Sequence, residues 1–274
     1  GRGGSDTTAV ALAAALDADV CEIYTDVDGV FSADPRVVPT ARKLKSVTYD
    51  EMLELAAAGA KVLHLRCVEY ARRYNLPIHV RSSFSSNEGT WVVENHPQGG
   101  NMEQAIISGI AHDKTEAKVT IVGVPDRTGI AARIFQAIAD ADINIDMIVQ
   151  NVSAAATGLT DISFTVPKAE GANATAVLKR IQGEVGFASI QYDDSIGKLS
   201  LVGAGMRSHP GVTATFFAAM AEAGLNIEMI STSEIRISII CRESDLEKGV
   251  RAAHTAFGLD ADQVEAVVYG GSGR

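Results

Sequence analysis

A glycine-rich hexapeptide opens the chain, Gly1-Arg2-Gly3-Gly4-Ser5-Asp6, directly before an apolar helical pattern over 7–16. Glycines let the backbone approach an anion closely, and the free amides at a helix N-terminus favour negative charge. Arg2 adds a guanidinium that can pair with a carboxylate or a phosphate. Ser5 or Asp6 can also simply cap this helix. The sequence therefore indicates a helix start with two uses, capping and anion binding.

A second polar stretch, Thr25–Phe31, follows an apolar strand pattern at 21–25 and is continued by Asp34-Pro35-Arg36. In open α/β sheets, ligands bind beyond the carboxyl ends of the strands. A calcium loop is excluded, because the twelfth position counted from Asp26 is Val37 instead of glutamate. A β-turn accounts for Asp28-Gly29 but leaves Asp34–Arg36 unexplained, so the stretch is a candidate ligand loop.

Other chemistry-bearing pairs are weaker. His64 and Cys67 lie three residues apart on an expected helix, but two ligands do not make a zinc site. The Gly203-x-Gly205 pair departs from the dinucleotide pattern at Ser208. The sequence shows no Ser/His/Asp or Cys/His arrangement, although such groups can still meet in space. We expect no metal site built from protein side chains.

An internal repeat organises the second half of the chain. Residues 118–123 match residues 198–203 at an offset of 80 positions. Residues 143–148 match residues 225–230 at an offset of 82, so the second copy contains a two-residue insertion. Apolar residues of one helical face follow in each copy, and Ile235, Ile237 and Ile239 alternate with polar residues as in a half-buried strand. Each copy is predicted to be a βαββαβ unit with its helices on one face of the sheet.

Residues 1–101 have a different pattern, in which helices alternate with apolar strands as in an α/β layered sheet. Ser46 or Thr48 is expected to cap one of the helices. Residues 87–100 are expected to be a linker. The predicted helices are 7–16, 49–58 and 60–74, and the predicted strands are 21–25, 77–82 and 90–94.

Polar loops recur in the repeat. Asp126–Gly129 and Ser208–Gly211 each precede a helix, and Asn144–Asp146 recurs as Asn226–Glu228. One interpretation is turn and capping chemistry, repeated because the fold is repeated. The other is an amino-acid pocket in which helix amides bind a carboxylate and a nearby acid binds an amine. The residues alone leave both open.

Composition narrows the function classes. A length of 274 residues suggests about two domains, and 46% hydrophobic with 21% charged residues is typical of a soluble globular protein. A net charge of −10 without basic runs argues against a nucleic-acid partner. No apolar stretch is long enough for a membrane span or has a signal peptide's flanks. Three scattered cysteines predict a cytoplasmic protein without a disulfide framework.

The motifs together resemble the aspartate kinase family, amino-acid kinases that carry two ACT regulatory domains. The resemblance extends over essentially the whole chain. It rests on segments 1–9, 24–31, 34–36 and 59–64, together with Asn144–Asp146, Gln150-Asn151 and Ser231–Glu234 of the repeats. It implies the C-terminal part of an amino-acid kinase αβα sandwich followed by two ferredoxin-like ACT domains, hence α/β plus α+β. The implied domains are 1–101, 102–193 and 194–274, with ACT strands free to interleave.

The resemblance implies ATP-dependent phosphorylation of the aspartate β-carboxylate with Mg²⁺. Arg2, Gly3, Gly4 and Ser5 match the aspartate-binding loop, and Asp6 matches an acid that orients a catalytic lysine.

The nucleotide contacts of the family match Thr25, Asp26, Phe31, Arg36 and Lys61. Phe31 stands where the family often has tyrosine, which keeps the ring but loses the hydroxyl.

Feedback by threonine and/or lysine is implied as well, in pockets between the ACT domains of two chains. A homodimer, with a regulatory subunit as a further partner, follows from the same resemblance. The matching effector residues are Asp126, Gly129, Ile130, Ala131, Asn144, Ile145, Asp146 and Gln150 on one side and Val212, Thr213, Asn226, Ile227, Ser233 and Glu234 on the other.

One departure concerns the family's Lys-Phe-Gly-Gly segment, which supplies a catalytic lysine and does not occur in these 274 residues. We therefore expect an N-terminally truncated aspartate kinase that is inactive alone. The alternative is a purely regulatory amino-acid-binding chain, in which 1–101 has only a structural role.

Overall fold

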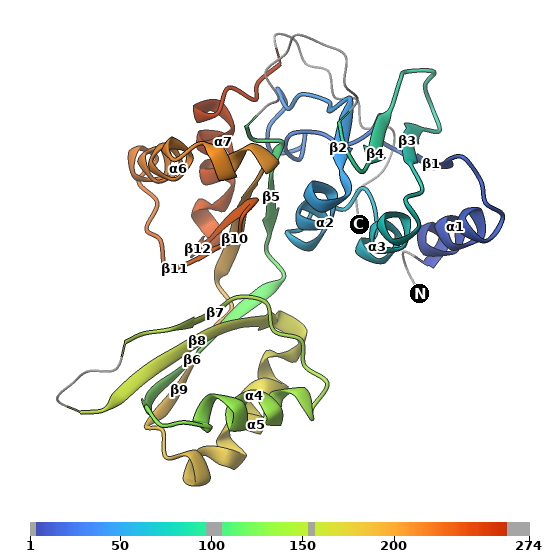
Figure 1. Ribbon diagram of the computed structural model, residues 1–274. Helices are drawn as coiled ribbons and strands as arrows, with labels where there is room; N and C mark the ends of the chain where they lie inside the picture. The colour runs from blue at the N-terminus through green and yellow to red at the C-terminus, as the bar shows by residue number, and fades with distance from the viewer. Residues whose placement is uncertain (1–3, 97–105, 153–156, 262–274) are drawn as a thin grey trace.

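The structure is a computed structural model that describes residues 4–96, 106–152 and 157–261. It contains three four-stranded sheets, one in the N-terminal part and one in each repeat unit (Figure 1). No helix in these described ranges is long and apolar enough to cross a membrane.

The N-terminal part is a small α/β layer whose sheet has the strand order β1-β3-β4-β2. β1 and β3 are parallel, so their carboxyl ends meet at one edge of the sheet. Thr48 caps α2 in a capping box with Glu51, as predicted. The elements are α1 Gly4–Ala15, β1 Cys21–Thr25, β2 Ser46–Thr48, α2 Tyr49–Ala57, α3 Leu65–Tyr74, β3 Ile78–Ser82 and β4 Thr90–Val93.

Two helix starts differ from the sequence prediction. α1 begins at Gly4, so Ser5 and Asp6 lie inside its first turn and neither is the N-cap. α3 begins at Leu65, five residues later than predicted, because the His64 ring caps it by accepting from the Arg66 N–H at 3.4 Å.

The first repeat unit spans 116–193 and has the predicted βαββαβ order. Its antiparallel sheet runs β7-β8-β6-β9, and α4 and α5 pack together against one face (Figure 1). β7 is shorter than the strand predicted at 143–152. The elements are β6 Glu116–Pro125, α4 Ile130–Ala139, β7 Ile148–Gln150, β8 Leu159–Pro167, η1 Lys168–Glu170, α5 Gly171–Val185 and β9 Ser189–Asp193.

The second repeat unit, 196–257, completes its sheet with a strand from elsewhere. The order is β11-β12-β10-β5, and β5, Gly109–Asp113, precedes the first unit in the chain. The last strand predicted for this copy would lie beyond residue 261, outside the described residues. The elements are β10 Ile196–Val202, η2 Ala204–Ser208, α6 Gly211–Glu222, β11 Met229–Thr232, β12 Arg236–Arg242, η3 Glu243–Asp245 and α7 Leu246–Ala256.

The prediction that β12 is half-buried was wrong. Residues 237–241 are buried on both faces, and the Ser238 hydroxyl pairs with that of Ser200 at 2.7 Å. One reason is that Ile240 packs with Met147 of the first unit, and helices also cover both sides of the neighbouring strands. α7 lies against β5 and β10 on one face, and α2 of the N-terminal part contacts the same strands from the other (Figure 1).

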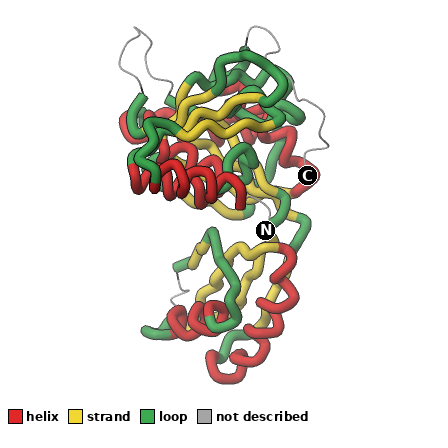
Figure 2. Tube along the Cα trace, turned by 90° about the vertical axis from the view of Figure 1, so that its right-hand side faces the viewer, coloured by secondary structure: helices red, strands yellow, loops and turns green. Residues whose placement is uncertain are grey.

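Glu51 of α2 joins the N-terminal part to the second unit. Its buried carboxylate accepts hydrogen bonds from the Ser108 hydroxyl at 2.5 Å and from the Ala204 N–H at 3.0 Å. Thr48 donates twice from the capping box, and the His96 ring lies 3.3 Å away. These contacts attach the second unit to the N-terminal part. The first unit lies at the lower end in both views, away from the N-terminal part (Figures 1 and 2).

Candidate functional site

Polar residues meet where β1 and β3 end. Thr25 and Ser82 are paired, and the following Ser83 N–H donates to the Thr25 carbonyl at 2.8 Å. The Thr25 hydroxyl donates to the exposed Asp26 carboxylate at 3.1 Å. Two of the predicted nucleotide residues therefore lie at the sheet edge where α/β folds bind ligands.

The next turn is fixed in place by buried polar contacts. The Asp28 carboxylate accepts from Ser85 at 2.5 Å and from the Asn87 amide at 3.3 Å. Gly29 has φ +137°, and a Cβ there would lie 2.5 Å from the Thr90 hydroxyl oxygen. This position therefore requires glycine, both for its backbone conformation and for the close approach.

Asp34 and Arg36 form a local fork. The Arg36 guanidinium donates to both Asp34 carboxylate oxygens, at 3.0 and 2.7 Å. The backbone N–H of Arg36 also donates to Asp34 Oδ1, at 2.9 Å. Burial raises the pKa of Asp34, but the hydrogen bonds from Arg36 outweigh it and the pKa is lowered. The guanidinium remains half-exposed. Lys61 is exposed in the connection between α2 and α3.

Phe31 has a different environment from the other predicted nucleotide residues. Its side chain is only 7% exposed and belongs to the core cluster of the second repeat unit, which also contains Leu199, Phe216 and Ile237. The ring therefore packs in the core in this structure. No local pattern in the sequence marks this contact, because Phe31 lies in a loop far from the repeat.

The start of α1 presents Gly4 and Ser5 to solvent, with Asp6 half-buried beside them. Burial, followed by the nearby Asp6 charge, raises the pKa of the Cys67 thiol to about 12. This buried thiol is therefore not a nucleophile at neutral pH. Arg2 and Gly3, both predicted to bind substrate, lie outside the described residues.

In the first repeat unit, the predicted effector residues surround the start of α4 and the turn before β7. Gly129 precedes α4 with φ +91°, and the Asp126 N–H donates to the Gly158 carbonyl at 2.9 Å. The Asp126 side chain is exposed. Of the others, Ile130 and Ala131 open the helix, Asn144 and Ile145 lie in the turn, and Gln150 is exposed on β7.

Asp146, the predicted acid, is already paired. Its carboxylate accepts a hydrogen bond from Lys198 of β10 at 2.5 Å, and Glu116 holds the same ammonium at 2.5 Å. Burial lowers the pKa of Lys198, but these two carboxylates outweigh burial and raise it. A second ion pair joins the two units with the roles exchanged, because here the lysine, Lys118, belongs to the first unit and the acid, Glu228, to the second.

A cavity of about 380 Å³ opens in the second unit beside the start of α6. It brings together four predicted effector residues from α6 and the turn after β11. Asn226 and Ile227 are not part of its lining, and three further residues were missed by the sequence analysis. The lining is Val212, Thr213, Ser233 and Glu234 with Met206, Thr232 and Ile237.

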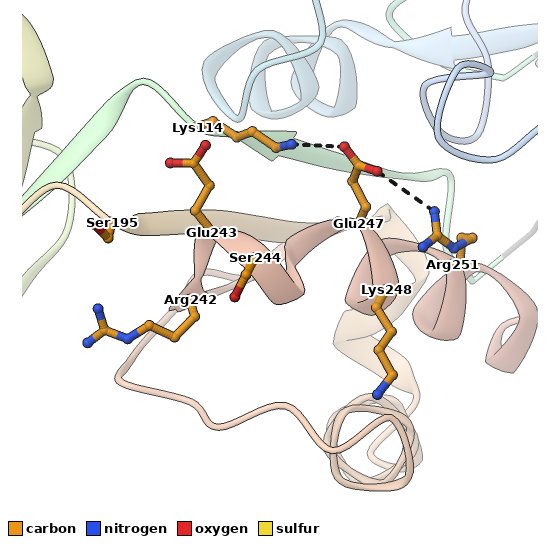
Figure 3. Close-up of a pocket in the computed structure, with 8 residues that line it drawn as sticks. All are labelled: Lys114, Ser195, Arg242, Glu243, Ser244, Glu247, Lys248 and Arg251. Carbon is orange, nitrogen blue, oxygen red and sulfur yellow. Dashed lines mark hydrogen bonds and ion pairs between the residues drawn. The ribbon is translucent and has the colours of Figure 1, made fainter.

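A larger open hollow of about 570 Å³ lies where both connections between the units pass α7 (Figure 3). Lys114 and Arg251 both pair with Glu247, at 2.8 and 4.0 Å. Glu243 pairs with Lys168 at 2.8 Å, and Arg242 turns toward Asp193 and Glu228. The hollow is therefore chiefly a junction of ion pairs. The remaining lining residues are Ser195, Ser244 and Lys248.

Comparisons with known proteins agree with this architecture. Residues 1–82 match the amino acid kinase family, and residues 119–181 and 199–257 match the ACT domain. The aspartokinase of Mycolicibacterium smegmatis is 63% identical over all 274 residues, which cover 65% of that protein.

Two solved structures extend the comparison. One contains aspartokinase α and β subunits, with 47% identity and a TM-score of 0.52, covering 56% of this chain and 99% of the other. The other is E. coli aspartokinase III in complex with lysine and aspartate, with 27% identity and a TM-score of 0.71, covering 94% of this chain and 56% of the other.

Fold and family matches together define part of an amino acid kinase domain joined to two ACT units. The chain belongs to the aspartokinase family. It spans 65% of the length of the aspartokinases of Mycolicibacterium smegmatis and Corynebacterium efficiens.

Proposed function

We propose that this chain is the C-terminal part of an aspartate kinase, which transfers the γ-phosphoryl group of ATP to the β-carboxylate of aspartate. The observation that carries this proposal is 63% identity to an aspartokinase across all 274 residues. The nucleotide-side geometry supports it, because Thr25 and Asp26 lie where parallel strands end. The three free cysteines of the described residues suit a cytoplasmic enzyme.

The residues divide into two groups by substrate. Thr25, Asp26, Arg36 and Lys61 would bind the nucleotide, with the cations neutralising phosphate charge that develops in phosphoryl transfer. Aspartate would bind at the start of α1, where the helix amides and Ser5 are exposed. The resemblance adds Arg2, Gly3 and Gly4 to this loop and assigns Asp6 to orienting a lysine.

Mg²⁺ fits this arrangement as an ion bound mainly by the nucleotide. The described part of the chain contains no group of three or more His, Cys, Asp or Glu side chains that could hold a metal. Magnesium in kinases is usually held by one or two carboxylates and the substrate phosphates, where it neutralises phosphate charge. Asp26, exposed beside Thr25, is the carboxylate available at this edge.

Threonine and/or lysine are proposed as effectors at the ACT units. The 380 Å³ cavity supports this, because it combines helix amides at Thr213 with the Glu234 carboxylate. The E. coli relative was solved with lysine and aspartate. A homodimer through the ACT units, with a regulatory subunit as a further partner, follows the resemblance and the solved α and β subunits.

The experiment is ATP-dependent formation of aspartyl hydroxamate, assayed on the 274-residue chain and on the full-length protein that contains it. Activity of the full-length protein, absent with glutamate in place of aspartate, is the expected result. Lack of activity there would overturn the proposal.

A purely regulatory amino-acid-binding chain is the second candidate. It is favoured by the solved α and β subunit structure, of which this chain covers 99% while using only 56% of its own length. Calorimetric titration of the 274-residue chain with threonine and lysine, alone and together, separates the two. Effector binding combined with an inactive full-length protein would favour this second candidate.

A further inference from the structure

Four side chains form a continuous hydrogen-bonded chain between the N-terminal part and the second ACT unit. Ser32 Oγ lies 2.8 Å from His254 Nε2, and His254 Nδ1 lies 3.1 Å from Asp260 Oδ1. The Thr40 hydroxyl donates to the same Asp260 oxygen at 2.5 Å. We call these residues, Ser32, Thr40, His254 and Asp260, the His254 clamp.

The direction of each hydrogen bond follows from the partners. Because the Asp260 carboxylate can only accept, Nδ1 of His254 carries a proton and donates to it. Burial lowers the pKa of His254, which leaves the ring neutral and Nε2 free to accept. Ser32 therefore donates to Nε2, while its oxygen accepts from the Arg42 N–H at 2.9 Å. The side-chain polar atoms of Ser32, Thr40 and His254 thus all have hydrogen-bond partners.

The residue types are those of a nucleophilic triad, yet the geometry excludes that chemistry. Ser32 and His254 are both 0% exposed, so no substrate reaches the serine oxygen. A hydrogen-bonded network with a buried centre instead fixes the relative position of the elements that contribute to it. Here those elements are the loop of residues 31–42 and the C-terminal end of α7.

The loop that is held in this way carries one of the proposed nucleotide residues, Arg36, whose guanidinium donates to the Asp34 carboxylate. Backbone contacts support the side-chain network on both sides. The Ala261 N–H donates to the Thr40 carbonyl at 2.8 Å, and the Ile110 N–H of β5 donates to the Ser32 carbonyl at 2.7 Å. The loop is therefore built into the second ACT unit more than into the sheet from which it emerges.

The same loop shares a core with the effector cavity. Phe31 and Val38 belong to one buried cluster with Val212 and Ile237, which line the 380 Å³ cavity. Packed cores respond to a change at one side by discrete shifts rather than by smooth deformation. A ligand in the cavity and the position of Asp34–Arg36 are thus connected through contiguous packing.

We propose that His254 is a positioning residue for nucleotide binding. Through His254, the second ACT unit sets the position of the loop of residues 31–42, which contains Asp34 and Arg36. The inference rests on the proposed kinase function for its kinetic consequence. It goes beyond that function by naming the contact that links regulatory unit and nucleotide loop. The decisive contact is the one from Ser32 to Nε2, since Ser32 lies in the loop itself.

Two amide substitutions separate the halves of the clamp. His254→Gln places an oxygen near Nε2 and keeps an acceptor for Ser32. His254→Asn keeps a donor for Asp260 and leaves Ser32 only the more distant Leu259 carbonyl, at 3.5 Å, as an acceptor. In the full-length protein, His254→Asn should raise KM for ATP about fivefold, as expected for one lost hydrogen bond. KM for aspartate should stay unchanged, and His254→Gln should behave as wild type.

Ser200→Ala is the matched control, because it removes another buried hydroxyl pair of the same unit, at 2.7 Å, without touching the loop. It should leave KM for ATP unchanged. An equal rise in Ser200→Ala and His254→Asn would show general destabilisation and overturn the proposal. If His254→Asn does not fold, Thr40→Val tests the outer end of the clamp with the same expected direction.

Hydrogen exchange of the Val37, Val38 and Ala41 amides provides a readout that does not depend on activity. These amides donate within the loop and should exchange about fivefold faster in His254→Asn than in His254→Gln. Equal exchange in both variants would overturn the clamp. A full-length protein that exchanges as expected but lacks kinase activity would instead refute the proposed function.

Discussion

Lys198 of the second ACT unit hydrogen-bonds Asp146 of the first, and Lys118 of the first pairs with Glu228 of the second. Lysine and acid occupy equivalent places in the two repeats, so the units exchange the same ion pair in both directions. A small apolar cluster of Met147, with its repeat counterpart Met229 and neighbouring isoleucines, lies at the same contact. The duplication thus created an interface as well as two similar folds.

The first prediction concerns Lys198, whose side chain is 1% exposed. Lys198→Met should lower the free energy of unfolding by about 3–5 kcal/mol, because Glu116 and Asp146 would remain without their shared cation. Urea unfolding measures this. Lys114→Met is the control, since its pair with Glu247 is solvent-exposed and should contribute less than about 1 kcal/mol. Equal effects of the two substitutions would contradict the prediction.

The second prediction is a pH dependence centred on Glu51. Burial raises its pKa, but hydrogen bonds from His96, Ser108, Thr48 and Ala204 outweigh burial and lower it to about 2. A folded pKa below the unfolded value of about 4.3 means that the stabilisation, about 3 kcal/mol, is present above pH 4.3. It is lost as the pH falls from there toward 2.

His96 adds an upper limit to the same pH window. The hydrogen bond between His96 and Glu51 raises the pKa of His96. The stabilisation from this protonated pair is therefore present below about pH 6.5 and is lost as the pH rises through the raised pKa. The stability difference between wild type and Glu51→Gln should therefore be largest between about pH 4.5 and 6.5. Urea unfolding across pH 3–8 tests this, with exposed Glu69→Gln as control. A pH-independent difference would refute it.

The third prediction compares the two candidate effector sites. Threonine or lysine should raise the melting temperature of wild type by mass action. Asp126→Ala should abolish the ligand-induced stabilisation that depends on the first unit. Glu234→Ala should abolish the stabilisation that comes from binding in the 380 Å³ cavity. Glu222→Ala, at the far end of α6, should leave both intact. Differential scanning calorimetry decides, and undiminished stabilisation in Asp126→Ala would remove that residue from the effector site.

The fourth prediction uses two glycines of opposite character. Gly29→Ala should cost about 1–3 kcal/mol of stability, since φ is +137° and the new Cβ would lie 2.5 Å from the Thr90 hydroxyl oxygen. Gly183→Ala, inside α5 with open space around it, should instead stabilise by about 0.5–1 kcal/mol. Thermal unfolding of both variants checks the signs. A neutral Gly29→Ala would show that the turn relaxes.

The sequence predicted what depends on local periodicity. The fold class was confirmed, as were the helix after Thr48 and the βαββαβ order of elements in the first unit, because their patterns repeat every 3.6 or two residues. The place of β5 could not be predicted, since its five residues pair with β10 far along the chain. The burial of β12 was missed for a related reason, because Ile240 of β12 packs with Met147, which belongs to the first unit.

The candidate sites show the same division. Thr25 and Asp26 could be placed from a strand followed by polar residues, whereas the family resemblance pointed to Val212, Thr213, Ser233 and Glu234. The pairing of Asp146 with Lys198 required knowledge of how the units face each other. The His254 clamp joins residues more than two hundred positions apart, and no local pattern marks such a contact.

The position of β5 has a consequence for the order in which the protein is made. Its partner β10 emerges from the ribosome only after the whole of the first ACT unit. The backbone of β5 therefore cannot pair with β10 while roughly eighty further residues are synthesised. The first unit contains all of its own strands and can fold at once. Cleavage between residues 113 and 116 would break the covalent connection between β5 and the other three strands of its sheet, whereas the four strands of the first unit would stay on one segment.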